Sequence, residues 1–171
     1  MWRLTRAPNV MFLGACRILL NNGQGLSKNL SDVTVASSQY DLLLCSDTLV
    51  SDRCHVSELL VPGFGRLVLL CRDGMPRARG MAAYVRDRYV AFRQHKYECG
   101  CCEMLVFRVC GGRQNFYVFS LYRNPDLDDR IYDCLLTAMA AVQGQQMRVP
   151  RSCLWVTVIT VDLFSIVENK L

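Results

Sequence analysis

The sequence predicts an α/β fold, because strand and helix patterns alternate along the chain. Residues 17–46 read as a strand, a turn, a helix and a second strand, a common beginning for an α/β chain. Residues 103–121 read as two strands joined by Gly111-Gly112, which is a strong hairpin signal. The most regular helical pattern of the chain follows this hairpin and ends near Val142.

Length and composition are those of a globular domain rather than of a membrane protein. The chain has 171 residues, of which 51% are hydrophobic and 20% are charged, enough for one domain with a core. Its longest apolar run, 154–161, is too short to span a bilayer. Several of the ten cysteines, among them Cys16, Cys45 and Cys110, lie inside apolar runs as small hydrophobic residues do. We therefore expect a reducing, intracellular location, in the nucleus or cytoplasm, and no membrane.

The first part of the chain is built around a short buried strand. We expect residues 1–15 to be a disordered leader, followed by a strand at 17–20 and a helix at 26–37. The run 42–46 has no polar alternation, which suits a strand buried on both faces. Asp47 follows directly, at a place where open α/β sheets carry their chemistry. It is either a metal ligand or a turn cap, and the local sequence favours the cap.

Positive charge is concentrated in the middle of the chain. The window Arg66–Lys96 contains eight basic residues against two acidic ones, so it carries +6 while the whole chain carries +5. Such an excess favours a polyanionic partner. Within it, Arg72, Arg77 and Arg79 are the candidate nucleic-acid-binding residues. A solvated surface on a mildly basic protein is an equally good interpretation.

The second part of the chain carries strands, a cysteine cluster and a long helix. Further strands are expected, with 89–94 continuing the same sheet: 64–70, 80–85, 89–94, 103–109 and 115–121. Cys99, Cys101 and Cys102 lie close in sequence but lack a second pair at the spacing of zinc fingers, so thiols are favoured over a zinc site. The helix is expected to be capped by Asn124 or Asp126. Gly144 should break it.

Five short motifs together resemble the endonuclease/exonuclease/phosphatase domains, and most of all those of non-LTR retrotransposon polyproteins. They occur in the order seen in that family and span about residues 16–143: Ile18–Leu26 (ILLNNGQGL), Leu42–Leu49 (LLLCSDTL), Leu60–Gly63 (LVPG), Arg79–Val85 (RGMAAYV) and Leu121–Pro125 (LYRNP). The resemblance implies the DNase I-like fold, an α/β sandwich of two packed sheets with helices outside. It also implies cleavage of phosphodiester or phosphomonoester bonds with Mg²⁺.

Three residues of this chain match functional positions of the family. The resemblance implies that Asn22 corresponds to its first active-site Asn, Asp47 to its metal-binding Glu and Tyr122 to its active-site Tyr. Asp47 and Asn22 would then be oxygen ligands of a hard cation such as Mg²⁺. Asn22 and Tyr122 would hydrogen-bond phosphate oxygens or a metal-bound water.

The departures from the family pattern predict a truncated domain. Asp47 is one methylene shorter than the family's Glu, and neither the family's Asp-x-Asn motif nor its later Asp-His pair is found. Asp162 stands in an Asp-Leu-Phe sequence, and the only histidines, His55 and His95, precede the helix. Residues 144–171 are expected to be an unrelated tail, so the two-sheet sandwich should be incomplete.

We therefore expect a retrotransposon-derived domain whose ancestors hydrolysed DNA with Mg²⁺, and which is itself inactive. Catalytic groups act as a unit, so that losing several removes most of the rate. Two alternatives remain open: a residual Mg²⁺-dependent nuclease, and a module that binds DNA or protein through Arg66–Lys96. A product without a selected role is a third.

Overall fold

The structure of the chain is a computed structural model. The chain divides into two compact units, residues 1–87 and residues 88–171. The residues described are 9–13, 16–22, 25–51, 53–70, 79–100, 102–111, 114–122, 130–146, 154–160 and 166–169. Each unit contains one five-stranded sheet, and each is described by itself below.

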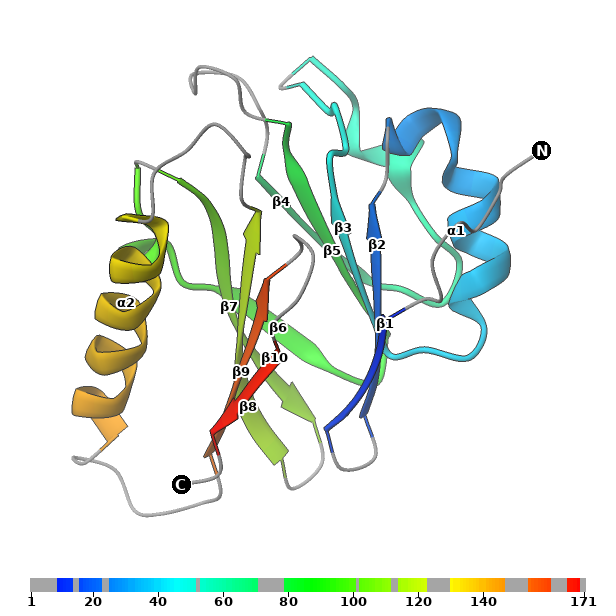
Figure 1. Cartoon of the computed structure of the whole chain (residues 1–171). Helices are drawn as coiled ribbons and strands as arrows, with labels where there is room; N and C mark the ends of the chain where they lie inside the picture. Colours follow the sequence, from blue (N-terminus) through cyan, green and yellow to red (C-terminus); the bar gives the residue numbers. More distant parts are fainter. Residues whose placement is uncertain are drawn as a thin grey trace. The chain divides into compact units, whose positions relative to one another are not determined.

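The sheet of the first unit has the strand order β1-β2-β3-β5-β4 (Figure 1). Its strands are β1 (Asn9–Leu13), β2 (Cys16–Asn22), β3 (Leu42–Ser46), β4 (Arg66–Leu70) and β5 (Met81–Val85). Only β2 and β3 run parallel; the other neighbouring pairs are antiparallel. The helical segments are η1 (Leu26–Lys28), α1 (Leu30–Ser37) and η2 (Val56–Leu59), of which only α1 is an α-helix.

Strand β3 lies at the centre of this sheet, and every one of its residues is buried. The prediction of a strand buried on both faces is confirmed over its full predicted range. One face packs in a core cluster that includes Leu43 of β3, Tyr84 of β5 and Val33 of α1. The ring of Phe64 meets that of Tyr84 edge-on, with centroids 6.4 Å apart. This packing leaves the polar residues that follow β3 at one end of a rigid strand.

Two expectations for the first unit require correction. Residues 9–13, expected in a disordered leader, form strand β1, which pairs antiparallel with β2 through a register of Met11 with Ile18. The helix expected at 26–37 is divided into the 3₁₀ turn η1 and the α-helix α1. Gly25 precedes it with a φ of 89°, a left-handed conformation that glycine adopts without steric cost.

The sheet of the second unit has the strand order β10-β9-β8-β7-β6. Its strands are β6 (Val90–Arg93), β7 (Glu103–Gly111), β8 (Gln114–Tyr122), β9 (Leu154–Thr160) and β10 (Ile166–Asn169). Strands β8 and β9 run parallel, and the other neighbouring pairs are antiparallel. The helical segments are the 3₁₀ turn η3 (His95–Tyr97) and the helix α2 (Arg130–Gln146).

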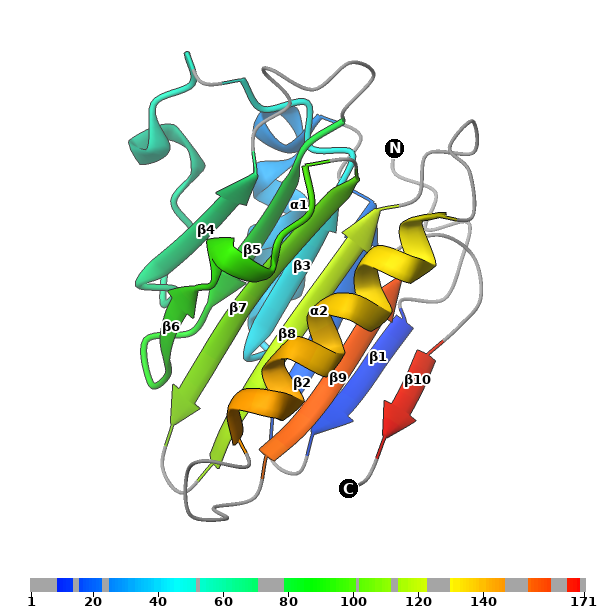
Figure 2. The same ribbon diagram turned by 90° about the vertical axis from the view of Figure 1, so that its left-hand side faces the viewer.

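Helix α2 lies along one face of this sheet (Figure 2). Its buried side chains recur every three or four residues, at Ile131, Leu135, Ala138, Met139 and Val142, and they pack in one cluster with residues of β7 and β8. The predicted hairpin 103–121 and the predicted apolar helix face are therefore confirmed. Neither α2 nor any other helix in the described part of the chain is long and apolar enough to cross a membrane.

Three expectations for the second unit differ from the structure. Residues 90–93 pair with β7 rather than continuing the first sheet. Helix α2 continues past Gly144 to Gln146. A helical glycine costs only about 1 kcal/mol, and Gln145 gains a hydrogen bond from the Tyr97 hydroxyl at 2.6 Å. The expected caps, Asn124 and Asp126, lie outside the described residues.

The part of the chain expected to be an unrelated tail supplies two strands of the second sheet. Strand β9 pairs in parallel with β8, with Val118 opposite Thr157, and β10 pairs with β9. Since α2 joins β8 to β9, this segment completes a β-α-β unit. The two compact units divide after Asp87, and the expected domain boundary after residue 143 stays a prediction.

Candidate functional site

The candidate site of the first unit lies at the carboxyl ends of β2 and β3. These strands are parallel, and Asn22, the last residue of β2, is in register with Ser46, the last residue of β3. Asp47 follows Ser46 directly. The structure thus brings the backbones of Asn22 and Asp47 to the same edge of one sheet, which is where α/β folds place their binding sites.

The loop after β3 is held by backbone hydrogen bonds from two sides. The N–H of Gly25 donates to the carbonyl of Asp47 at 3.0 Å, and the N–H of Thr48 donates to the carbonyl of Gly80 at 3.2 Å. Thr48 itself is buried. These bonds join the loop to the segment after β2 and to the start of β5. Together with β3, which directly precedes Asp47, they fix the position of its backbone.

This loop has an unusual backbone. Asp47 has a φ of 52° and Leu49 a φ of 54°, both in the left-handed region, and they are the non-glycine residues with positive φ among those described. Aspartate tolerates this region, but a leucine there costs roughly 1–2 kcal/mol. Such strain persists where the surrounding structure imposes it, often at functional sites. The hydrogen bonds of the preceding paragraph supply that constraint.

The carboxylate of Asp47 faces an arginine of its own unit. A guanidinium nitrogen of Arg79 lies 3.5 Å from Asp47 Oδ1, and the two side chains are 54% and 15% exposed. Burial raises the pKa of Asp47, and the positive charge of Arg79 lowers it by a smaller amount. Two buried atoms here, Asp47 Oδ1 and Ser46 Oγ, have no hydrogen-bond partner among the described residues. Asp47 Oδ1 is thus a partly desolvated acceptor that favours a cation.

The residues around Asp47 supply one oxygen ligand of the kind that Mg²⁺ prefers. A buried carboxylate oxygen without a hydrogen bond has the chemistry of a Mg²⁺ ligand. However, Arg79 already brings a positive charge to the same oxygen, and among the residues described at these two strand ends only Asp47 has a carboxylate. Since Mg²⁺ is usually held by one or two carboxylates together with substrate phosphates, the described residues do not form a complete site by themselves.

The other predicted site residues are Tyr122, Arg72, Arg77 and Arg79, and they do not all lie at this edge. Tyr122 is the last residue of β8 in the second unit, where it is half-buried and in register with Glu103 of β7. Arg72 and Arg77 lie outside the described residues. Arg79, expected to bind nucleic acid, makes the ion pair with Asp47 described above.

Sequence patterns did not predict the ion pair between Arg79 and Asp47. Strand β5 runs antiparallel to β3, with Met81 opposite Ser46, so the residues just before β5 lie beside those just after β3. Nothing local indicates this pairing, because 32 residues separate the two side chains. The shared edge could have been found only by predicting that β3 and β5 are neighbours.

Two other arginines of the basic window are also engaged within their own units. Arg86 donates to the backbone carbonyls of Ser37 and Tyr40, each at 2.7 Å. Arg93 makes a bidentate contact with the carboxylate of Glu98, with a closest N–O distance of 2.9 Å. Part of the positive charge in Arg66–Lys96 therefore stabilises loops of the fold.

Comparison with known proteins identifies the fold from structure alone. No family model matches the chain, and no curated protein matches it. Among solved structures, the AP endonuclease LMAP from Leishmania major matches 90% of this chain with a TM-score of 0.61 and 10% identity. The catalytic domain of Xenopus laevis APE2 matches 84% of it, with a TM-score of 0.52 and 11% identity. The endonuclease domain of TRAS1, a telomere-specific non-LTR retrotransposon, matches 82%, with a TM-score of 0.51 and 12% identity.

These matches cover most of this chain but less of the other proteins. The chain spans 59% of the Leishmania enzyme, 57% of the Xenopus domain and 57% of the TRAS1 domain. At such low identity the likeness shows the fold and nothing finer. The two-sheet α/β class expected from the five sequence motifs is confirmed. The chain therefore shares the fold of these solved structures: two five-stranded sheets with few helices.

Proposed function

We propose that this chain is a retrotransposon-derived endonuclease/exonuclease/phosphatase-like domain that does not hydrolyse DNA by itself. The fold, the five sequence motifs and the strand-end positions of Asn22 and Asp47 support descent from a Mg²⁺-dependent phosphodiesterase. The observation that carries the proposed inactivity is the contact of Arg79 with Asp47 Oδ1. An internal guanidinium supplies the positive charge that a metal ion would bring to that carboxylate.

The amino-acid sequence of the chain also supports the proposed lack of catalysis. The chain contains no Asp-x-Asn and no Asp-His pair, and its histidines are His55 and His95. A general base, a phosphate-stabilising group and a metal-bound carboxylate act as a unit, so their effects on rate are far from additive. A strand end with one neutralised carboxylate can bind a phosphate-containing partner without cleaving it.

The test is nicking of supercoiled plasmid by the purified chain with Mg²⁺ or Mn²⁺, beside an Asp47→Ala control. We expect no metal-dependent nicking by either protein. Metal-dependent nicking by the unmodified chain that disappears in Asp47→Ala would refute the proposal. Nicking that is equal in both proteins reports a contaminating nuclease, which further purification removes.

A direct measurement of metal binding separates the role of Arg79 from catalysis. We expect Arg79→Met to bind Mn²⁺ more tightly than the unmodified chain, because the competing charge is gone. Asp47→Ala should bind it no better. Equal Mn²⁺ affinity in the unmodified chain and in Arg79→Met would show that the guanidinium does not block the carboxylate.

Residual nuclease activity is the second candidate, and the position of β9 favours it. In the family, a strand that carries a carboxylate follows the helix, and here β9 follows α2 and pairs with β8. Asp162 comes two residues after the end of β9 and lies outside the described residues. If metal-dependent nicking is found, Asp162→Asn should reduce it about as strongly as Asp47→Ala. A fully active Asp162→Asn protein would exclude this role.

We also propose that DNA binds weakly through the basic window. Arg79 keeps 54% of its side chain exposed, and Arg66 and Arg88 are exposed as well. Released counterions should make the affinity fall steeply as salt rises. Changing Arg77 and Arg79 together to Glu should weaken binding more than the same change at Lys28 and Arg53, which are exposed outside the window. Equal loss in the two double variants would refute the assignment.

A further inference from the structure

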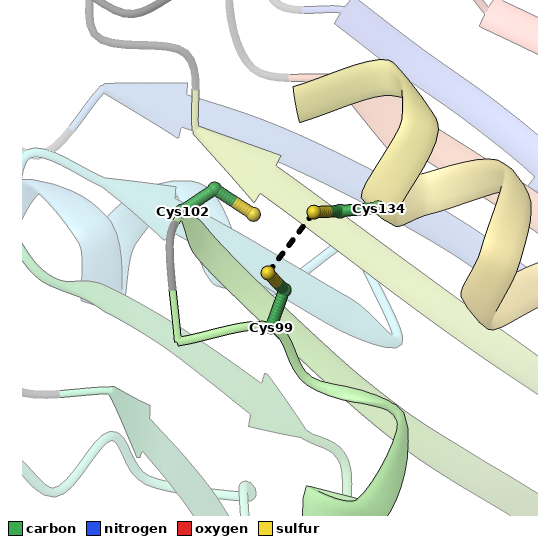
Figure 3. Close-up of side chains that lie close together, drawn as sticks. All are labelled: Cys99, Cys102 and Cys134. Atoms are coloured by element: carbon green, nitrogen blue, oxygen red, sulfur yellow. Dashed lines mark hydrogen bonds between the residues drawn. The ribbon is translucent and has the colours of Figure 1, made fainter. Parts of the chain in front are cut away.

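Three cysteines of the second unit meet at one point (Figure 3). Cys99 and Cys102 come from the segment before β7, and Cys134 comes from helix α2. Their sulfur atoms all lie within 4.8 Å of one another. The Cys134 thiol donates a hydrogen bond to the Cys99 sulfur at 3.0 Å. The fold therefore adds to the sequence pair Cys-x-x-Cys a third sulfur, 35 residues along the chain from Cys99.

The spacing of these sulfurs matches the geometry of a thiolate-bound metal. Zinc–sulfur bonds of about 2.3 Å in a tetrahedron place neighbouring sulfurs about 3.8 Å apart. The three sulfurs lie within 4.8 Å of one another, and those of Cys134 and Cys99 are 3.0 Å apart, so their spacing is close to that arrangement. Three protein thiolates leave one tetrahedral position for a further donor.

The surroundings of the cluster favour a soft cation. Cys102 is 4% exposed, and Cys99 and Cys134 pack against the same apolar cluster as the buried face of α2. A coordinated metal ion stabilises the thiolates directly, so binding releases their protons.

A metal site at this cluster requires Cys99 to be reduced. Cys99 is disulfide-bonded in the structure, whereas Cys102 and Cys134 carry thiols. A disulfide sulfur is a poor metal ligand, since the thiolate is the form that binds. Reduction of this disulfide by a thiol reductant takes two electrons and two protons, and the reductant leaves as its own disulfide.

We propose that Cys99, Cys102 and Cys134 form a redox-gated zinc site that binds Zn²⁺ when all three are reduced. The metal is released when a disulfide oxidant converts Cys99 back to its disulfide and itself leaves as two thiols. On binding, the three thiols give up three protons and form three zinc–sulfur bonds. The metal joins the loop before β7 to helix α2, so zinc binding should stabilise the second unit. The proposal is independent of the proposed function, because it uses no residue of the Asp47 loop.

The test uses the full chain, reduced with a phosphine that does not bind zinc and freed of metal with a chelator. We expect a single equivalent of Zn²⁺ in competition with a chromophoric chelator. Co²⁺ should give the intense absorption of sulfur-to-cobalt charge transfer. The same chain left oxidised should bind neither ion stoichiometrically. Equal binding by the reduced and oxidised proteins, or no binding by the reduced protein, would overturn the proposal.

Variants locate the site. Cys134→Ser and Cys102→Ser should each weaken Zn²⁺ binding by about a hundredfold or more, since even second-sphere changes cost 10–100-fold. Cys110→Ser is the matched control: Cys110 is a half-buried thiol of β7 outside the cluster, and its loss should leave the affinity unchanged. Circular dichroism confirms that each variant is folded. A folded Cys134→Ser protein that binds zinc like the unmodified chain would refute the proposal.

Discussion

The two sheets of this chain share one pattern of strand directions but differ at the ends of their parallel strands. In each sheet a parallel pair is flanked by one antiparallel strand on one side and two on the other. The pair is β2 and β3 in the first unit and β8 and β9 in the second, each joined through a helix. At its strand ends the first unit has a strained, arginine-paired carboxylate, whereas the second has Tyr122.

The comparison shows that the residues that form the fold are not the residues that could carry chemistry. The common pattern depends on apolar strands and β-α-β connections, which many residues can satisfy. The chemistry depends on a few side chains at strand ends and in loops, and the described ones differ between the two sheets. The helices differ as well: α1 has eight residues and α2 has seventeen. The second unit should therefore owe more of its stability to its helix.

The largest expected change in the free energy of unfolding comes from truncating a core side chain in each unit. Phe119 of β8 is fully buried in the cluster beneath α2, and Leu43 of β3 is fully buried in the cluster beneath α1. Phe119→Ala should cost about 3–5 kcal/mol and Leu43→Ala about 2–5 kcal/mol. Hydrogen exchange measured peptide by peptide should show protection lost first in the unit that carries the substitution. Simultaneous loss in both units would mean that they unfold as one body.

A smaller effect on the free energy of unfolding concerns one half-buried arginine in each unit. Arg86→Met removes two hydrogen bonds to backbone carbonyls and the contact of Arg86 with the buried Asp41. Arg93→Met removes the bidentate contact with Glu98, which still accepts from the N–H of Val106. We expect Arg86→Met to lower the free energy of unfolding by about 1.5–3 kcal/mol, and Arg93→Met to lower it by an amount at the lower end of that range.

Urea denaturation measures both losses, with Arg66→Met as the control. Arg66 is exposed on β4, so its replacement should change stability by less than about 0.5 kcal/mol. If Arg93→Met proves more damaging than Arg86→Met, the loop of the second unit depends on its ion pair more than that of the first.

The smallest effect is a gain in stability at the candidate site. Burial raises the pKa of Asp47, so the folded state holds this proton more tightly than the unfolded state. The charged form therefore opposes folding, increasingly as pH rises from the ordinary value of 3.8 through the folded pKa. Asparagine also tolerates the left-handed φ of this position. Asp47→Asn should stabilise the chain by about 0.5–1 kcal/mol at neutral pH.

Thermal melting across the acidic range checks this prediction. The gain in melting temperature of Asp47→Asn should shrink as pH falls below 3.8, where the carboxyl is protonated in both states. A gain that is independent of pH would assign it to the backbone conformation instead of the buried charge. A loss of stability at neutral pH would mean that the ion pair with Arg79 outweighs both terms.

Local sequence patterns were enough to predict the central strand, the hairpin, the long helix and the sheet edge of the first candidate site. The unbroken apolar run 42–46 marked a strand buried on both faces, and Asp47 directly after it marked the strand end. The Gly111-Gly112 pair and the apolar stripe from Ile131 to Val142 marked the hairpin and the helix. These signals are local, because periodicity of burial is set by the backbone geometry of each element.

Which elements are neighbours became clear from the packed fold and not from local sequence. The contact of Arg79 with Asp47 depends on the pairing of β5 with β3, and the meeting of Cys134 with Cys99 depends on α2 lying on its sheet. The place of β9 beside β8 likewise turned an expected tail into part of a sheet. Such contacts join residues more than 30 positions apart, and apolar strands of similar composition can pair in many orders. Local sequence therefore leaves the partners undetermined until the whole core is packed.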